Sequence, residues 1–531
     1  YGLARMLPSL KRTLLLITAS SKQAWEAHQS LSFFLGLAEQ WRGDPLECPL
    51  WLFPTANRRM QAEPFVAPDV QAQRLAVLYA SAASSQAKII VAPAQAVMEK
   101  VLPRRHCLDA SRYLVVREEI QREELISHLV SIGYYRTDLV EEVGDLSVRG
   151  DIIDLYTPLY PQPLRLEYFD EVLESIRFFS PASQRSSEHL DDVIIVPAHE
   201  VLLTPSRQQR AASSLTEALE EEGTLRSDLE LWQERVKGLG HFPGIEQLLP
   251  LYYDRLETLF DYLPPSTLVV QSNLGSIKKT VVELLEQAGR DRDVARQSSR
   301  WTLSPETYLL NEAEIDSSLE SYPQILQSSL PVEHAFDGKS SEILHFRLGD
   351  HRGLQQKIQD HQQRQRLLEP LAERLQQWQK SGMSPFLVCR TAEQGRRVED
   401  LLTDYGVDAQ FSSEPFGQLS FRAPVTKIVV GRLPMGFLWP DEGLAVVTET
   451  ELYGEKPRRH RVSPPETGSF LTTFADLQAD DFVVHLDHGI AIYKELVHLK
   501  INEHSNDFLL LEYQDGDLLY LPVDRLDRVQ K

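Results

Sequence analysis

Three residues between positions 144 and 169 have side chains suited to binding another protein: Arg149, Arg165 and Phe169. They lie in two strand-like runs, 146–156 and 164–169, on either side of a proline-rich turn, and this pattern predicts an antiparallel hairpin. Because side chains alternate between the two faces of a strand, Arg165 and Phe169 should share the face opposite the apolar residues of their run. Arginine and aromatic side chains are common anchors of protein–protein interfaces. The pattern therefore indicates a docking surface more than a reaction site.

The same residues have a second interpretation, which the pattern supports equally well. Both arginines could form ion pairs with Glu167 or Asp151, and Phe169 could belong to the core. Patterning alone does not choose between an interface and an ordinary ion-paired strand.

No group of residues predicts catalysis, nucleotide binding or a metal site. The sequence contains no Gly-x-x-x-x-Gly-Lys-Ser/Thr loop: the nearest match, Gly275–Thr280, lacks the second glycine, and the loop Thr18–Lys22 has no glycine at all. His485 and His488 are three residues apart on a strand-to-turn path, so they should face different directions and have structural roles. We expect no catalytic residue, no metal and no cofactor in this chain.

Length and charge limit the classes of function. The 531 residues should form about three to five domains. With 77 acidic against 55 basic residues the net charge is −22, so the chain should not wrap nucleic acid over its whole surface. The basic run Lys456–Arg461 is more typical of a solvated linker than of a DNA-binding segment.

Cysteine usage and hydropathy indicate the compartment. Cys48, Cys107 and Cys389 have no disulfide or zinc-site spacing, as expected of thiols in a reducing cytosol. No run approaches the roughly 18 apolar residues of a membrane span, so we expect a cytoplasmic protein with no membrane partner. The chain opens at Tyr1 without a methionine, and we expect it to be a piece of a longer protein.

The order of elements predicts an α/β architecture with an insertion. Residues 12–107 alternate strand-like and helical segments, the pattern of a parallel α/β layer. Residues 112–200 are β-rich, and Thr267–Gln271 is a further buried strand. We therefore expect a first α/β domain that is interrupted by a β-rich insert before the chain returns to the first sheet.

A second, small α/β unit should begin near residue 340. Its first helix candidate, Leu354–Lys380, should be kinked or broken at Pro370. Residues 475–531 are all strand and turn, with a hairpin turn at Gln514–Asp517, which predicts a small β-barrel of SH3 or Tudor type.

Three blocks of sequence resemble known families. The 133–186 region resembles the β-rich second domain shared by UvrB and the bacterial transcription-repair coupling factors. Lys427–Gly431 and Leu444–Gly454 are similar to the third domain of the coupling factors. Asp481–Ile490 and Leu519–Val523 look like their polymerase-interacting domain, which is related to CarD-type regulators. The order of the blocks is that of the coupling factors.

The resemblance implies a multidomain α/β fold. The expected parts are a UvrB-like domain 1A (1–110), a UvrA-binding domain 2 (111–202), domain 1B with a connector (203–330), a small α/β domain (340–454), a basic linker (455–474) and a CarD-like barrel (475–531).

The resemblance also implies partners and site residues. In the family, two arginines and a phenylalanine of the second domain bind UvrA; the matching residues are Arg149, Arg165 and Phe169. The barrel is expected to lend a strand edge to the RNA polymerase β subunit through Val497, Leu499 and Ile501. ATP, magnesium and contact with double-stranded DNA upstream of stalled polymerase belong mainly to translocase domains that are absent from this chain.

Together these implications predict an adaptor in transcription-coupled excision repair. Two alternatives remain: a UvrB-like, ATP-dependent repair helicase subunit, and a CarD-like transcription regulator that acts through the barrel alone.

Overall fold

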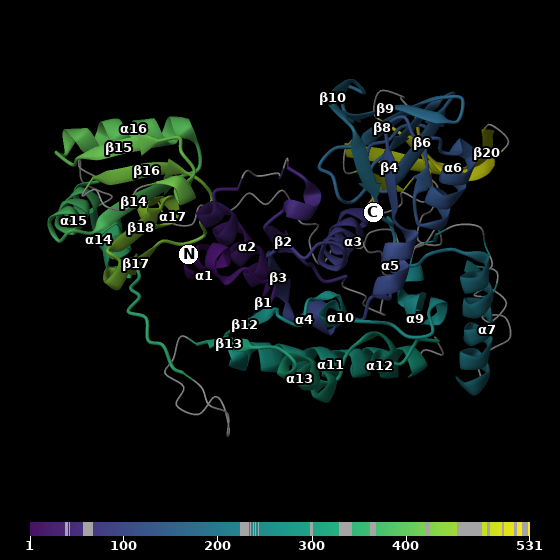
Figure 1. Ribbon diagram of the computed structural model, residues 1–531, viewed down its shortest axis with the longest axis horizontal. Coiled ribbons are helices and arrows are strands. Elements are labelled where there is room, and N and C mark those ends of the chain that lie inside the picture. The colour runs from purple at the N-terminus through teal and green to yellow at the C-terminus, as the bar shows by residue number, and fades with distance from the viewer. Residues whose placement is uncertain are drawn as a thin grey trace.

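The computed structural model is a mixed α/β molecule with two mainly parallel sheets, one mainly antiparallel sheet and two antiparallel ones (Figure 1). It describes residues 1–37, 41, 43–56, 67–222, 233, 235–236, 238, 241–242, 244–297, 301–328, 342–361, 368–419, 425–453, 481–485, 489–501, 504–513, 518–522 and 529–530. Within this part of the chain, no helix is both long and apolar enough to span a membrane.

The first sheet is parallel throughout and has the strand order β13-β12-β1-β3-β2. The strands are β1 (Leu14–Thr18), β2 (Leu50–Leu52), β3 (Ile89–Pro93), β12 (Leu268–Ser272) and β13 (Gln324–Gln327). Since β12 and β13 join this sheet after the β-rich segment, the expected interruption and return of the chain is observed.

Helix α2 (Ser21–Leu35) begins and ends where the local sequence favours it. The Ser20 side chain accepts a hydrogen bond from the Gln23 amide at the first turn. Gly36 takes a left-handed conformation (φ 70°) directly after Leu35 and ends the helix.

Helices cover both faces of the first sheet. α1 (Gly2–Leu10) and α2 pack on one face. The other face has its own core, to which the following helices contribute: α3 (Pro68–Ala83), α4 (Ala94–Met98), α5 (Arg104–Ala110), α9 (Leu249–Tyr252), α10 (Leu259–Tyr262), α11 (Leu274–Gln297), α12 (Pro305–Tyr308) and α13 (Glu312–Glu320).

The β-rich insert contains a six-stranded sheet in the order β10-β9-β8-β7-β6-β5. Its strands are β5 (Tyr135–Arg136), β6 (Asp145–Arg149), β7 (Ile152–Leu155), β8 (Leu164–Phe169), β9 (Val172–Phe179) and β10 (Ser186–Leu190). β4 (Arg112–Val115) and β11 (Asp192–Ile195) form a separate antiparallel pair, α6 (Arg122–Ser131) lies between β4 and β5 along the chain, and α7 (Pro205–Glu222) follows the insert.

The predicted single strand over 146–156 is wrong. The chain turns at Gly150 and Asp151, where Gly150 has a left-handed φ of 59°, and Arg149 pairs with Ile152 across the turn. The run is thus two antiparallel strands, and the expected hairpin with 164–169 is formed by β7 and β8.

The second α/β unit has the strand order β15-β16-β14-β18-β17, in which only β17 is antiparallel to its neighbour. Its strands are β14 (Ser384–Cys389), β15 (Ala409–Ser412), β16 (Thr426–Val430), β17 (Phe437–Trp439) and β18 (Leu444–Thr448), and its helices are α14 (Arg352–His361), α15 (Glu369–Lys380), α16 (Ala392–Asp404) and α17 (Glu449–Tyr453). Pro370 lies in the first turn of α15, so the predicted long helix is indeed broken before this proline.

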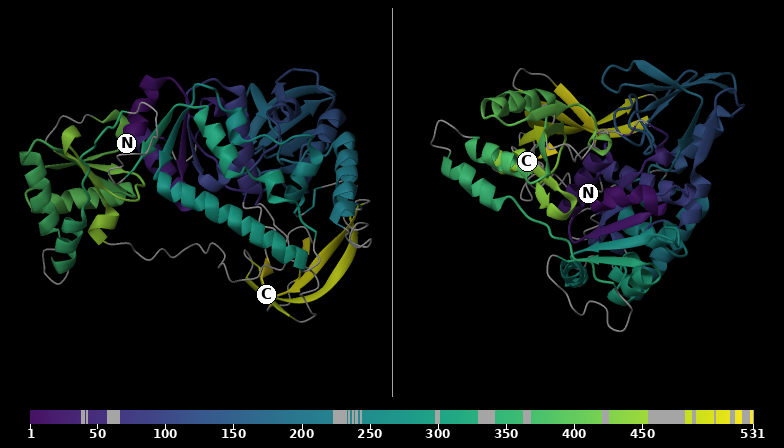
Figure 2. Two further views of the ribbon diagram at one scale, coloured as in Figure 1. Left: turned by 90° about the horizontal axis from the view of Figure 1, so that it is seen from below. Right: turned by 60° about the vertical axis from the view of Figure 1, so that its left-hand side comes forward.

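The two α/β units share one layer of helices. α1 and α2 lie between the first sheet and the second unit (Figure 2, left), and a single core cluster joins residues from both sheets. Phe34 of α2 packs edge-on against Phe416, with ring centroids 5.0 Å apart, and Phe386 of β14 lies 4.9 Å from the same ring. Each sheet therefore depends on the same two helices to cover one of its faces.

The C-terminal strands form an antiparallel sheet in the order β22-β21-β20-β19-β23. They are β19 (Phe482–His485), β20 (Gly489–Ile501), β21 (His504–Glu512), β22 (Leu518–Pro522) and β23 (Val529–Gln530). The predicted turn at 514–517 and the basic run at 456–461 lie outside the described residues.

A buried arginine joins the insert to the first unit. Arg74 of α3 is fully buried; its Nη1 lies 2.8 Å from Oε2 of Glu99, and its Nε lies 2.8 Å from Oε1 of Glu200. Glu99 follows α4, whereas Glu200 stands where the chain leaves the insert. Because a buried charge is tolerated only with charged or hydrogen-bonding partners, these three elements hold one another in place.

Arg74→Met should lower the free energy of unfolding by about 3–5 kcal/mol, because two buried carboxylates lose their counter-ion. Urea unfolding followed by circular dichroism measures the loss. The matched control is Arg105→Met, on an exposed guanidinium. Adding Glu99→Gln and Glu200→Gln to Arg74→Met should recover part of the loss; equal stability of Arg74→Met and the control would contradict the role given to Arg74.

Candidate docking surfaces

Strand β8 presents its side chains as the alternation predicts. Leu164, Leu166 and Tyr168 are buried, whereas Arg165 and Glu167 are half-buried on the opposite face. Phe169, the last residue of the strand, is 74% exposed. The interpretation that placed Phe169 in the core is therefore wrong.

The two predicted arginines meet at one carboxylate, Asp154 of β7. Arg165 donates from Nε to Oδ1 (2.7 Å) and from Nη2 to Oδ2 (2.9 Å), and Arg149 donates from Nη2 to the same Oδ2 (2.6 Å). The Asp154 side chain is only 1% exposed. Ion pairing of both arginines is thus observed, with Asp154 and not with Glu167 or Asp151.

The sequence does not identify Asp154 as the partner of the two arginines, because the register between neighbouring strands determines which side chains meet. Asp154 is directly opposite Arg165 across β7 and β8, and Arg149 reaches it from the neighbouring strand β6. The available signal was a polar residue inside the apolar run Ile152–Leu155, since an unpaired carboxylate is rarely buried there.

Arg165 and Arg149 differ in what they can offer a partner. The Arg165 side chain is 14% exposed, stacks over the Phe179 ring at 4.8 Å, and donates a further hydrogen bond to the Gln184 carbonyl oxygen (3.3 Å). Its hydrogen bond to Asp154 raises the pKa of Arg165 above its ordinary value. The Arg149 side chain is 50% exposed. Arg149 and Phe169 are thus accessible, whereas Arg165 is held within the sheet face.

Asp154→Asn should lower the free energy of unfolding by about 3 kcal/mol, because two guanidinium groups lose a shared, buried counter-ion while the side-chain shape is kept. Chemical denaturation of the whole chain measures this change. Glu167→Gln is the control, since Glu167 pairs with the partly exposed Arg177 and such pairs contribute less than about 1 kcal/mol. Equal losses in the two variants would contradict a special role for Asp154.

The predicted polymerase-contact residues lie in the second half of β20. Val497 pairs with Phe508, Leu499 with Asn506, and Ile501 with His504, all on β21. Leu496 pairs with Leu509, which is buried.

The other edge of this half-strand is open within the described residues. β19 pairs with β20 only over residues 489–492. Beyond that point no described strand pairs with this side of β20.

Two backbone amides at the loop after β1 are bound by side chains of the chain itself. The Ala19 amide donates to Oε1 of Gln23 (3.2 Å), and the Gln23 amide donates to Oγ of Ser20 (3.3 Å). These two amides are thus not available to a phosphate group.

The described residues offer no reactive cluster either. No group of three potential metal ligands occurs among them. Burial raises the pKa of the Cys107 and Cys389 thiols to about 12, so both are inert at neutral pH.

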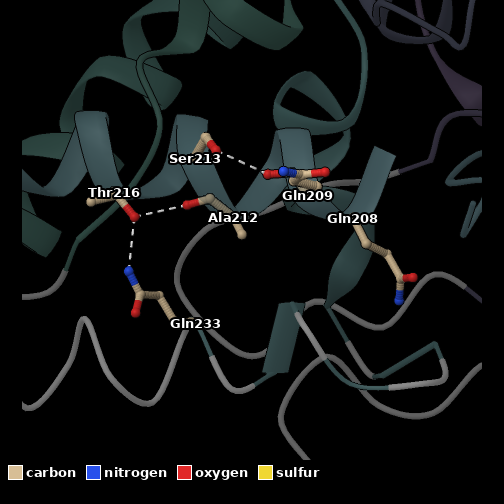
Figure 3. A pocket seen from close by; sticks show the side chains of 6 residues that line it. All are labelled: Gln208, Gln209, Ala212, Ser213, Thr216 and Gln233. Atoms are coloured by element: carbon tan, nitrogen blue, oxygen red, sulfur yellow. Dashed lines mark hydrogen bonds between the residues drawn. The ribbon is translucent and has the colours of Figure 1, made fainter. Parts of the chain in front are cut away.

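One hollow of about 430 Å³ lies beside α7 (Figure 3). Its polar side chains are hydrogen-bonded within the chain: Gln233 donates to Thr216 Oγ1 (2.8 Å), and Ser213 donates to the Gln209 carbonyl oxygen (3.1 Å). None of the described residues that line it is charged or titratable near neutral pH, so they offer no general acid or base.

Comparison with known proteins matches both docking regions. Residues 113–201 match the UvrB interaction domain, and residues 477–531 match the CarD-like/TRCF RID domain. The whole chain aligns with a transcription-repair-coupling factor of Myxococcus xanthus at 30% identity, and the alignment covers 44% of that protein's length. With the Bacillus subtilis (strain 168) factor the identity is 28%, over 90% of this chain and 40% of that protein. With the Staphylococcus aureus (strain MRSA252) factor the identity is 24%, over 98% of this chain and 43% of that protein. The chain thus spans less than half the length of these curated relatives.

Proposed function

We propose that this chain, a relative of transcription-repair-coupling factors along its full length, is the adaptor part of such a factor. One end docks on the UvrA repair subunit, and the other end holds RNA polymerase stalled at DNA damage. The observation that carries the proposal is the presence of a UvrB interaction domain and a CarD-like/TRCF RID domain in one chain.

The repair end is supported by an exposed aromatic side chain on an ordered sheet. Phe169 lies on the same sheet as Arg149, whose guanidinium is half exposed and partly neutralised by Asp154. A desolvated aromatic residue beside an arginine is the usual composition of an interface hot spot. We assign the direct UvrA contacts to Phe169 and Arg149. We assign a positioning role to Arg165, which stabilises this face through its ion pair with Asp154.

The polymerase end is supported by the open edge of β20. An added strand gains affinity from backbone hydrogen bonds, while alternate side chains give specificity. We propose that Val497, Leu499 and Ile501 flank such a strand from the polymerase β subunit, and that the C-terminal sheet closes into an SH3- or Tudor-like barrel. The domain boundaries expected from the sequence belong to the same proposal.

In the whole protein, ATP and magnesium would be used by translocase domains outside this chain. Those domains would also make most of the contact with double-stranded DNA upstream of polymerase, because the acidic charge of this chain disfavours extensive DNA contact. This chain would hold polymerase while the motor displaces it.

The helicase alternative requires a nucleotide site in the first unit. The amides around Ser20 are bound by the chain itself, which disfavours that alternative. Tight ATP binding by residues 1–300, measured by titration calorimetry, would support a UvrB-like helicase instead. The regulator alternative predicts that removal of residues 1–330 leaves function unchanged.

Phe169→Ser should weaken binding to purified UvrA by about 2 kcal/mol or more, because it removes an exposed anchor and no core contact. Surface plasmon resonance measures the affinity. Arg149→Glu should also weaken binding, whereas Leu401→Ser, at another exposed apolar side chain, should not. Wild-type affinity of both Phe169→Ser and Arg149→Glu would refute the repair end of the proposal.

Leu499→Arg should weaken binding to the polymerase β subunit and leave UvrA binding unchanged, because it places a charge beside the proposed added strand. A pull-down of each partner with the same protein preparation separates the two effects. Unaltered capture of the β subunit would refute the position of the polymerase contact.

A further inference from the structure

The face that carries Arg165 extends from β8 to the edge strand β5 of the six-stranded sheet. Directly paired residues lie on the same side of a sheet, so strand register traces this face from strand to strand. Arg165 pairs with Asp154, Asp154 with Ser147, and Asp145 on the same strand as Ser147 pairs with Tyr135. Tyr135, on the edge strand β5, therefore shares a face with the proposed UvrA contacts.

The centre of this face has its hydrogen bonds satisfied internally. Asp154 is occupied by the two arginines, Oδ2 of Asp145 accepts from the Glu141 and Glu142 amides (2.9 Å each), and Ser147 Oγ donates to the Asp138 carbonyl oxygen (3.0 Å). These buried polar groups have little left to offer a partner. Binding energy must then come from exposed side chains around them.

Tyr135 has the right chemistry for such an anchor. It is 51% exposed, and tyrosine combines a large apolar ring with a hydroxyl group and loses little conformational entropy when it is fixed. It lies at the opposite end of the face from Phe169.

The size of a stable interface also calls for a second anchor. A standard interface covers about 800 Å² on each partner, a patch roughly 30 Å across. Arg149, Arg165 and Phe169 come from strands β6 and β8, which are separated only by β7. Three strand spacings separate β8 from β5, roughly 15 Å, so the inclusion of Tyr135 extends the contact towards the expected width.

We propose that Tyr135 is a second aromatic anchor of the UvrA-docking face, at the opposite end from Phe169. This inference rests on the proposed function, because it assigns Tyr135 to the same partner. UvrA would cover both aromatic rings and span the ion-paired centre between them.

The test compares four variants of the full chain against purified UvrA by surface plasmon resonance: Tyr135→Ser, Phe169→Ser, their combination and Tyr113→Ser. Tyr113 is the matched control, a 61% exposed tyrosine of the same insert that belongs to the separate β4–β11 pair. Thermal unfolding establishes that each variant is folded.

Tyr135→Ser should raise the Kd by about tenfold or more, as expected for an interface anchor. Because the two rings are well separated, the fold-changes of Tyr135→Ser and Phe169→Ser should multiply in the combined variant. Tyr113→Ser should bind as the unaltered chain does.

Wild-type affinity of Tyr135→Ser together with weakened binding of Phe169→Ser would overturn this inference and leave the proposed function standing. Wild-type affinity of both variants would overturn both. Equal weakening by Tyr113→Ser would overturn the inference as well, because the effect would not be specific to this face.

Discussion

The placement of the insert depends on one buried cation. Arg74 lies between Glu99 and Glu200 with no access to water, so none of the three charges can be withdrawn without a large cost. Glu200 stands where the chain leaves the insert, and the Tyr253 hydroxyl donates to its carbonyl oxygen (2.7 Å). The six-stranded sheet, which we propose for docking, is consequently fixed to the first unit at this junction. A rigid base favours side-chain docking, because less conformational entropy is lost on binding.

A buried charge shared between opposite charges also stabilises the face that we propose for docking. Asp154 neutralises part of the charge of two arginines and orients both, so an acidic chain can present a positively charged patch without burying a free cation. The Arg149 side chain is 50% exposed and that of Arg165 14%, so Arg149 is the more accessible of the two guanidinium groups.

Local patterns predicted the elements well, and non-local contacts could not be predicted. The break before Pro370 and the alternation along β8 depend on neighbouring residues, and both are observed. The turn at Gly150 was missed because apolar residues continue on both sides of it. The pairing of Asp154 and the helix layer shared by the two units depend on register and packing between distant segments, and a single sequence carries no direct signal of either.

The two proposed ends would recognise their partners by different physics. The repair end offers side chains on a fixed sheet, so single substitutions there should have large effects. The polymerase end offers a strand edge whose backbone hydrogen bonds form with many side chains. An edge contact should therefore tolerate conservative changes of side chain, whereas a charge placed beside the added strand should still weaken it.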